Sequence, residues 1–140
     1  MNGKKILIVD DNPVIIAALS MKLLSAGYRA LTASDGSEAV SMARKERPDL
    51  ILLDINFPPD VAHGGGVGWD GFRIIEWLRR MDEAKDIPVI VISGDEAAKY
   101  RDRSMAAGAV GYFQKPIDNN ALLEAVKKAL SEKPDKPPSA

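Results

Sequence analysis

The sequence contains no cysteine, a single histidine and no apolar run that approaches the ~20 residues of a membrane span. The absence of cysteine excludes a disulfide framework and any chemistry that needs a thiolate. A formal net charge of −1 provides no basic field for nucleic acid or anionic lipid. The first residues lead directly into a strand-like run, which is unlike a signal peptide. We therefore expect a soluble, cytoplasmic protein that contacts neither nucleic acid nor membrane directly.

A chain of 140 residues is expected to form one domain. The end of the sequence differs from the rest, because residues 132–140 combine three prolines with charged residues and cannot join a core. We expect a folded domain over residues 1–131 and an extended tail over residues 132–140. The tail is either free or the start of a linker, and a stand-alone chain is the favoured alternative.

Short β-rich runs alternate with helical patterns along the chain. Five successive strand–helix units predict an α/β fold with a parallel sheet, right-handed crossovers and helices on both faces. Asn12 and Pro13 suit the N-cap and first position of the first helix, and Gly27 suits its C-terminal end. The predicted strands cover residues 5–9, 28–33, 50–53, 88–92 and 110–114, and the predicted helices cover residues 12–25, 37–46, 72–81, 96–107 and 118–131.

The sequence suggests buried faces for two of these helices. The helix over 72–81 has two alternative apolar faces, Phe72–Ile75–Leu78 and Ile74–Trp77–Leu78. The helix over 96–107 carries mostly alanine on its expected buried side, at Ala97, Ala98, Ala106 and Ala107. A helix that buries only alanine covers little area and is easily displaced.

Polar side chains gather at the predicted strand ends. In an open α/β sheet the ligand crevice lies outside the carboxyl ends of the strands. Here these ends carry Asp10 and Asp11, Asp54, Ser93 and, just after the last strand, Lys115. Carboxylates without histidine or cysteine suit a hard cation, most often Mg²⁺. With a hydroxyl and an amine beside them, they predict a site for a phosphoryl group, with one carboxylate as nucleophile and an aspartyl phosphate as product.

Each of these residues has a simpler structural interpretation when it is taken alone. Asp10 and Asp11 suit the cap of the first helix, and Asp54 suits an ordinary strand end. Ser93 suits a turn, and Lys115 suits a solvated surface position. Their joint occurrence at successive strand ends of one predicted sheet favours the phosphoryl site.

Four motifs in this chain resemble the receiver domain of two-component response regulators. They are Ile6–Asn12 (ILIVDDN), Leu52–Pro58 (LLDINFP), Val91–Gly94 (VISG) and Ala107–Pro116 (AGAVGYFQKP). The resemblance covers roughly residues 4–131. It implies a doubly wound, flavodoxin-like (βα)5 fold, a three-layer sandwich with parallel strand order 2-1-3-4-5.

The resemblance also implies a role for each matching residue. Asp54 would accept the phosphoryl group from a sensor histidine kinase or a histidine phosphotransfer protein. Mg²⁺, with Mn²⁺ as the alternative, would be held by Asp11, Asp54, the backbone carbonyl of Asn56 and, through water, Asp10. The chain would then be a phosphoacceptor that catalyses only its own phosphoryl transfer and autodephosphorylation, and no other enzyme activity.

Three further residues are assigned to the bound phosphoryl group and to the signal that it sends. Ser93 would donate a hydrogen bond to the phosphoryl group, and Lys115 would form an ion pair with it. Tyr112 would change its rotamer with the position of Ser93. The output face would be the fourth helix, fifth strand and fifth helix, which would contact a downstream effector protein.

The loop after Asp54 departs from the pattern of the family. Gly71 stands 17 positions beyond Asp54, farther than the corresponding glycine of typical receivers, which leaves an insertion within Pro59–Trp69. One interpretation is a tolerated surface insertion, because a longer flexible loop costs little. The other is a lid or partner-recognition loop that controls access to Asp54, with Trp69 as an aromatic anchor. His63 is expected to be a solvated loop residue, with a phosphohistidine or metal ligand as the weaker alternative.

Three other functions remain open at this point. A phosphatase of the haloacid-dehalogenase type also uses an aspartate nucleophile and Mg²⁺, but such enzymes carry a second aspartate where this chain has Asn56. A flavodoxin-like redox protein would share the topology, yet no obvious flavin loop is found in the sequence. A receiver-like module that acts by interaction alone is disfavoured by the complete set of acids, Ser93 and Lys115.

Overall fold

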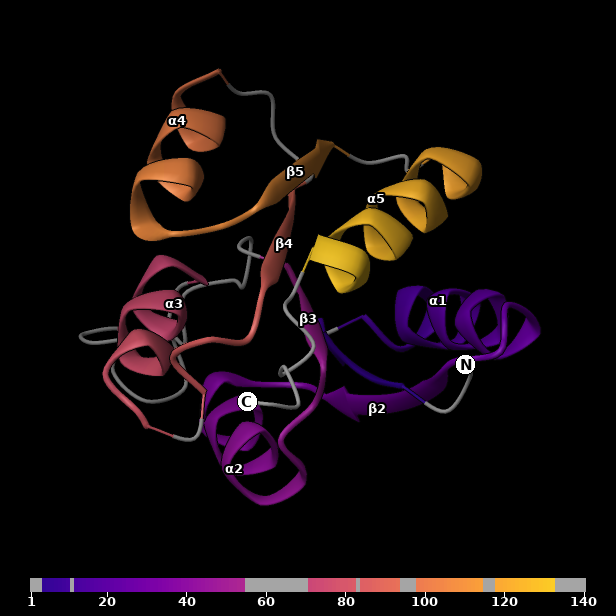
Figure 1. The fold of residues 1–140 in the computed structure, drawn as a ribbon, viewed down its shortest axis with the longest axis horizontal. Coiled ribbons are helices and arrows are strands. Elements are labelled where there is room, and N and C mark those ends of the chain that lie inside the picture. Colours follow the sequence, from indigo (N-terminus) through magenta and orange to yellow (C-terminus); the bar gives the residue numbers. More distant parts are fainter. Residues whose placement is uncertain are drawn as a thin grey trace.

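A computed structural model describes residues 4–10, 12–54, 71–82, 84–93, 98–114 and 118–132. These residues form five strands and five helices in strict alternation (Figure 1). Within the described ranges, no helix is long and apolar enough to cross a membrane. The elements are β1 (Lys5–Val9), α1 (Pro13–Ser25), β2 (Arg29–Ala33), α2 (Gly36–Glu46), β3 (Leu50–Asp54), α3 (Gly71–Arg79), β4 (Val89–Ser93), α4 (Ala98–Ala107), β5 (Gly111–Gln114) and α5 (Asn119–Glu132).

The five strands form one parallel sheet in the order β2-β1-β3-β4-β5. This order confirms the predicted topology. The central strand β3 pairs with β1 on one side, where Val9 lies opposite Leu53, and with β4 on the other, where Leu53 lies opposite Val91. The carboxyl ends of β1, β3 and β4 therefore meet at one edge of the sheet, which is the edge where the site was predicted.

Helices cover both faces of the sheet, as the strand sequences predict. Alternate residues of β1 belong to two separate apolar clusters, with Leu7 and Val9 in one and Ile6 and Ile8 in the other. The first cluster contains residues of α2 and α3, and the second contains residues of α1 and α5 (Figure 1). Strands buried on both faces must be apolar throughout, which explains the continuous runs of β1 and β3.

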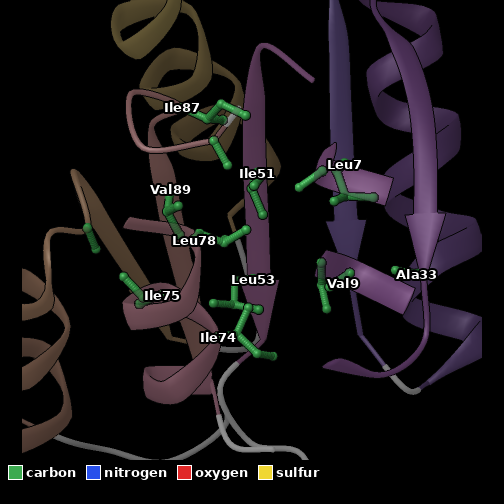
Figure 2. Packing of buried hydrophobic residues seen from close by; sticks show 14 of the residues in the cluster. Leu7, Val9, Ala33, Ile51, Leu53, Ile74, Ile75, Leu78, Ile87 and Val89 are labelled. Carbon is green, nitrogen blue, oxygen red and sulfur yellow. The ribbon is translucent and has the colours of Figure 1, made fainter. Parts of the chain in front are cut away.

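The structure decides between the two apolar faces proposed for α3. Ile74, Ile75 and Leu78 are fully buried, and Figure 2 shows Ile74 and Leu78 beside Leu53 of β3. Trp77 is 44% exposed, so the alternative that placed Trp77 against the sheet is wrong. The side chain of Phe72 lies outside the described part of the helix.

The ends of α1 follow the capping chemistry that the sequence predicts. The Asn12 side chain accepts a hydrogen bond from the backbone N–H of Val14 at 2.8 Å, and Pro13 occupies the first helical position. At the other end Gly27 has a φ of 97°, and its N–H and that of Tyr28 return to carbonyls of the last turn. This Schellman arrangement needs the left-handed conformation that glycine adopts without strain.

Several boundaries differ from the predicted ones for identifiable reasons. Asp54 and Ser93 are the last residues of β3 and β4, because Asp54 pairs with Ile92 and Ser93 pairs with Gln114. The helix predicted over 72–81 ends at Arg79, since the following two N–H groups bond three residues back instead of four. The remaining described ends agree with the predictions within two residues.

The buried side of α4 differs from the alanine face that the sequence suggests. Ser104 is fully buried, Ala107 is partly buried against the apolar cluster on the α3 side, and Ala106 is exposed. Among the side chains of α4 that the structure describes, those at 104 and 107 thus face inward, one turn apart, and Ala106 points away from them. Ala97 and the side chain of Ala98 lie outside the described residues.

Candidate functional site

Two buried aspartates stand at the carboxyl ends of neighbouring strands. Asp54 is the last residue of β3, and Asp10 follows the last residue of β1, which pairs with β3 through Val9 and Leu53. Asp54 is 3% exposed and Asp10 is 1% exposed. Both acids were predicted to meet here, and their placement confirms that they lie on adjacent strand ends.

Asp10 is fixed by the chain that leads from β1 into α1. Its N–H donates to the carbonyl of Ala33 at 3.1 Å, which continues the pairing with β2. Its Oδ1 accepts the N–H of Asn12 at 2.9 Å, and Asn12 in turn caps α1. The carboxylate is therefore held by the same turn that begins the helix, because an Asp at this position bonds the backbone two residues on.

The pair of buried acids fits a hard divalent cation. Like charges that are buried beside each other repel, and burial removes the water that would screen them. Carboxylate oxygens are the preferred ligands of Mg²⁺, so the chemistry of this donor pair suits the ion that the family resemblance implies. Within the described ranges, no group of three His, Asp or Glu side chains is placed to hold a metal, and Asp11, the third predicted acid, is outside these ranges.

Ser93 and Tyr112 come from the two strands beyond β3. Ser93 ends β4 at the same edge as Asp54, which lies opposite the neighbouring Ile92. Tyr112 of β5 lies opposite Val91 and packs, partly buried, against the apolar cluster on the α3 side. The backbone thus brings Ser93 to the acid edge, where it was predicted, and places Tyr112 on the sheet face that α4 also covers.

Five of the predicted site residues lie outside the described part of the chain. The loop that contains the predicted insertion falls there as well. The roles of these five residues toward the phosphoryl group, the metal and the partner therefore stay predictions. These residues are Asp11, Asn56, His63, Trp69 and Lys115.

The sequence reasoning missed one surface beside the acid edge. α1 begins at Pro13, three residues after Asp10, and the helix exposes apolar side chains along its length, with Val14 at 72%, Met21 at 69% and Leu24 at 58%. Lys22 is the only charged residue of this helix. The signal in the sequence is that residues 13–25 are apolar on nearly every side, so that a helix at the surface must leave some of them exposed. We call Val14, Ala17, Ala18, Met21 and Leu24 the α1 surface.

Comparison with known proteins gives the family of the chain. The family model described as "Response regulator receiver domain" matches residues 6–127. Sporulation initiation phosphotransferase F of Bacillus subtilis is 35% identical over 130 residues, which are 93% of this chain and 96% of that protein. Protein PilH of Pseudomonas aeruginosa is 32% identical over 127 residues, which are 91% of this chain and 98% of that protein.

A solved structure agrees with these sequence matches. The receiver domain of the sensor histidine kinase PA1611 of Pseudomonas aeruginosa, with a magnesium ion in its active-site cleft, has a TM-score of 0.79 and 28% identity. The match covers 93% of this chain and 99% of that one. The fold, the paired acids at the edge of the sheet and the matched residues agree on one conclusion. The chain belongs to the response regulator receiver domains of two-component systems.

Proposed function

We propose that Asp54 is the phosphoacceptor of this receiver domain and that a sensor histidine kinase or a histidine phosphotransfer protein is the donor. Receiver domains are phosphoacceptor signalling domains and not enzymes in the usual sense. The observation that carries the assignment is the position of Asp54, a buried carboxylate at the end of the central strand and beside Asp10. Oδ1 of Asp10 accepts the N–H of Asn12, and the family resemblance assigns the nucleophile to Asp54.

The transfer needs only groups that two such proteins bring together. A carboxylate oxygen of Asp54 attacks the phosphorus of a phosphohistidine and forms the new P–O bond. The P–N bond breaks, and its electron pair leaves with the imidazole, which takes up a proton. Later attack of water on the phosphorus returns the Asp54 carboxylate and inorganic phosphate, which is the autodephosphorylation expected of the domain.

The acids and the resemblance together point to Mg²⁺, with Mn²⁺ as the alternative. Asp11, Asp54 and the carbonyl of Asn56 would hold the ion, with Asp10 linked through water. A bound divalent cation supplies positive charge that offsets both the carboxylates and the phosphoryl oxygens. Asp10 contributes by holding its negative charge beside the acceptor, and Ser93 and Lys115 would bind the phosphoryl oxygens.

The α1 surface is suited to hold the phosphodonor protein over Asp54. A donor histidine must approach from outside the acid edge of the sheet, and the first turn of α1 borders that edge. An exposed apolar helix face with a polar edge is typical of a protein interface. We infer that the donor packs against this surface, with Val14 nearest to the site and Leu24 farthest from it.

The output passes through the β5 edge of the sheet. A phosphoryl group adds about −1.5 to −2 charges at Asp54, and Ser93 is the nearest hydroxyl-bearing strand end. Movement of Ser93 toward that charge would open space for Tyr112, which already packs inward from β5. We infer that α4, β5 and α5 form the face that a downstream effector protein recognises.

Labelling with a small phosphodonor tests the assignment without a partner protein. We expect acetyl phosphate with Mg²⁺ to add one phosphoryl group to the wild-type chain, with the acid-stable, base-labile behaviour of an acyl phosphate. The Asp54→Asn variant should not be labelled. Asp49→Asn is the matched control, since Asp49 precedes the same strand at its opposite end and should leave labelling unchanged. Equal labelling of Asp54→Asn and wild type would overturn the assignment.

A further inference from the structure

The guanidinium group of Arg79 joins three backbone carbonyls from two separate connections. Arg79 is the last residue of α3, and its Nη1 donates to the carbonyls of Lys85 at 3.1 Å and Ile87 at 3.0 Å, just before β4. Its Nη2 donates to the carbonyl of Gly108 at 3.1 Å, which follows the last residue of α4. One side chain thus ties the ends of α3 and α4 to the start of β4.

Arg79 is half-buried, and its bond to the carbonyl of Ile87 is partly shielded from solvent. Burial lowers the pKa of the Arg79 guanidinium, and the nearby carboxylate of Asp86 partly offsets this by raising it. A half-buried guanidinium loses part of its hydration, and bonds to carbonyl oxygens offset that loss. Its planar fork can serve several carbonyls at once, which the single ammonium of lysine does less well.

Gly108 is shaped for this contact. Its φ of +113° lies in the region that favours glycine, and a Cβ at this position would lie 3.0 Å from Nε of Arg79. The same residue ends α4, since the N–H of Gly108 bonds Met105 and that of Ala109 bonds Ser104. The C-terminal end of α4 is therefore capped and joined to Arg79 through one glycine.

Few of the described side chains of α4 pack against the sheet. Among its described side chains, Ser104 is fully buried and Ala107 partly buried, while Met105 and Ala106 are exposed. No large apolar side chain of the described part of α4 is buried, so packing against the sheet contributes little. The bonds at Gly108 attach the C-terminal end of this helix to α3 and to the start of β4.

The Arg79 contact lies at the amino ends of the strands, and the proposed phosphoacceptor lies at their carboxyl ends. The chain enters β4 beside Ile87 and enters β5 through Val110, whose N–H bonds the carbonyl of Val89. Ser93 and Asp54 lie at the other end of these strands. Five residues of β4 at roughly 3.3 Å each separate the two edges.

We propose that Arg79 is a positioning residue that fixes the C-terminal end of α4 at Gly108, so that phosphorylation moves only the other end of the helix. The proposal rests on the proposed function for the phosphorylation itself. The attachment of α4 by Arg79 is a property of the unmodified chain. With one end held, a change at Ser93 and Tyr112 becomes a rotation of α4 about Gly108.

Amide hydrogen exchange of α4 tests both parts of the proposal. The chain is compared with and without beryllium fluoride plus Mg²⁺, a mimic of the phosphoryl group. In the wild type we expect exchange to change over residues 98–102 and to stay constant over residues 105–109. In Arg79→Met, we expect residues 105–109 to exchange about tenfold faster before any mimic is added. The mimic should then alter both ends of the helix.

Two further variants separate this role from a general loss of stability. Gly108→Ala breaks the same contact from the other side and should reproduce the exchange pattern of Arg79→Met, which keeps the test open if one variant does not fold. Lys5→Met is the matched control, because Lys5 Nζ donates to the carbonyl of Glu46 at 2.7 Å at the same edge of the sheet. We expect Lys5→Met to leave both ends of α4 as in the wild type.

Several outcomes would overturn the proposal. One is wild-type exchange at residues 105–109 in Arg79→Met, and another is an equal response of both ends of α4 in the wild type. A third is a response of both ends of α4 to the mimic in Lys5→Met, as expected for Arg79→Met. If the mimic changes no amide of α4 in the wild type, the rotation is wrong. The labelling of Asp54 by acetyl phosphate would still test the proposed function, because it does not depend on any movement of α4.

Discussion

Asp10 and Asp54 end neighbouring strands, and both carboxylates are almost completely buried. Two negative charges in this position repel each other in the absence of a cation. We expect this repulsion to oppose folding in the absence of a cation and to favour the binding of a divalent ion. The first two predictions follow from this pair.

Removal of one charge from the pair should stabilise the metal-free protein. We expect Asp54→Asn to raise the free energy of unfolding by roughly 1–2 kcal/mol when a chelator is present, because asparagine keeps the size and one acceptor of aspartate. Urea unfolding at neutral pH measures the change. In the double variant with Asp10→Asn, the two effects should not add, since either substitution relieves the same repulsion. A loss of stability in Asp54→Asn would contradict this view.

Mg²⁺ should stabilise the wild-type chain and act much less on variants of the pair. A ligand that binds only the native state raises the free energy of unfolding by about 2.7 kcal/mol at one hundred times its dissociation constant. We expect Asp54→Asn to lose most of this increase. Asp49→Asn, at the opposite end of β3, should keep it. The measurement is the thermal midpoint over a Mg²⁺ titration, and an equal response of wild type and Asp54→Asn would argue against an ion at this edge.

The sequence predicted the sheet well because its central strands are buried on both faces. Continuous apolar runs such as Leu50–Leu53 admit few other placements, and the caps at Asn12 and Gly27 fix where α1 begins and ends. The meeting of Asp10 and Asp54 then follows from strand order alone. Local sequence is enough for features of this kind, since each depends on residues near in the chain or on the known topology of parallel sheets.

Features that depend on distant partners were not predictable in the same way. Arg79 bonds the carbonyl of Gly108, which is 29 positions away, and no local pattern marks a side chain that will meet it. Trp77 fits either face of an amphipathic helix, because its ring is apolar and its N–H is polar. The burial of Ser104 in place of Ala106 depends on how α4 turns toward the sheet, which alanine-rich helices specify weakly.

The end of α2 contains a strained position that glycine should relieve. Arg47 has φ 47° and ψ 62°, its side chain is exposed, and it precedes Pro48. The left-handed conformation costs an L-residue roughly 1–2 kcal/mol, while glycine loses more entropy on folding. We expect Arg47→Gly to raise the free energy of unfolding by up to about 1 kcal/mol. Arg47→Val should lower it, because β-branched residues avoid this region. Urea unfolding of both variants checks the order.

The α1 surface should control transfer from a protein donor and leave transfer from a small donor unchanged. Met21 is 69% exposed, so Met21→Lys should change the free energy of unfolding by less than about 0.5 kcal/mol. With a histidine kinase that phosphorylates the wild type, we expect transfer to slow by roughly tenfold or more, since a charge would enter an apolar contact. Labelling by acetyl phosphate should be the same in both proteins.

A charge reversal on the other side of the sheet serves as the control for the α1 surface. Arg44 is exposed on α2, which packs on the opposite face from α1. If apolar contact over α1 guides the donor, Arg44→Glu should leave kinase transfer within about twofold of the wild type. Equal slowing by Met21→Lys and Arg44→Glu would point to a general charge effect. If Met21→Lys also slowed the reaction with acetyl phosphate, the substitution would be acting on Asp54 and not on the contact with the kinase. Either of these two results would exclude α1 as the docking face.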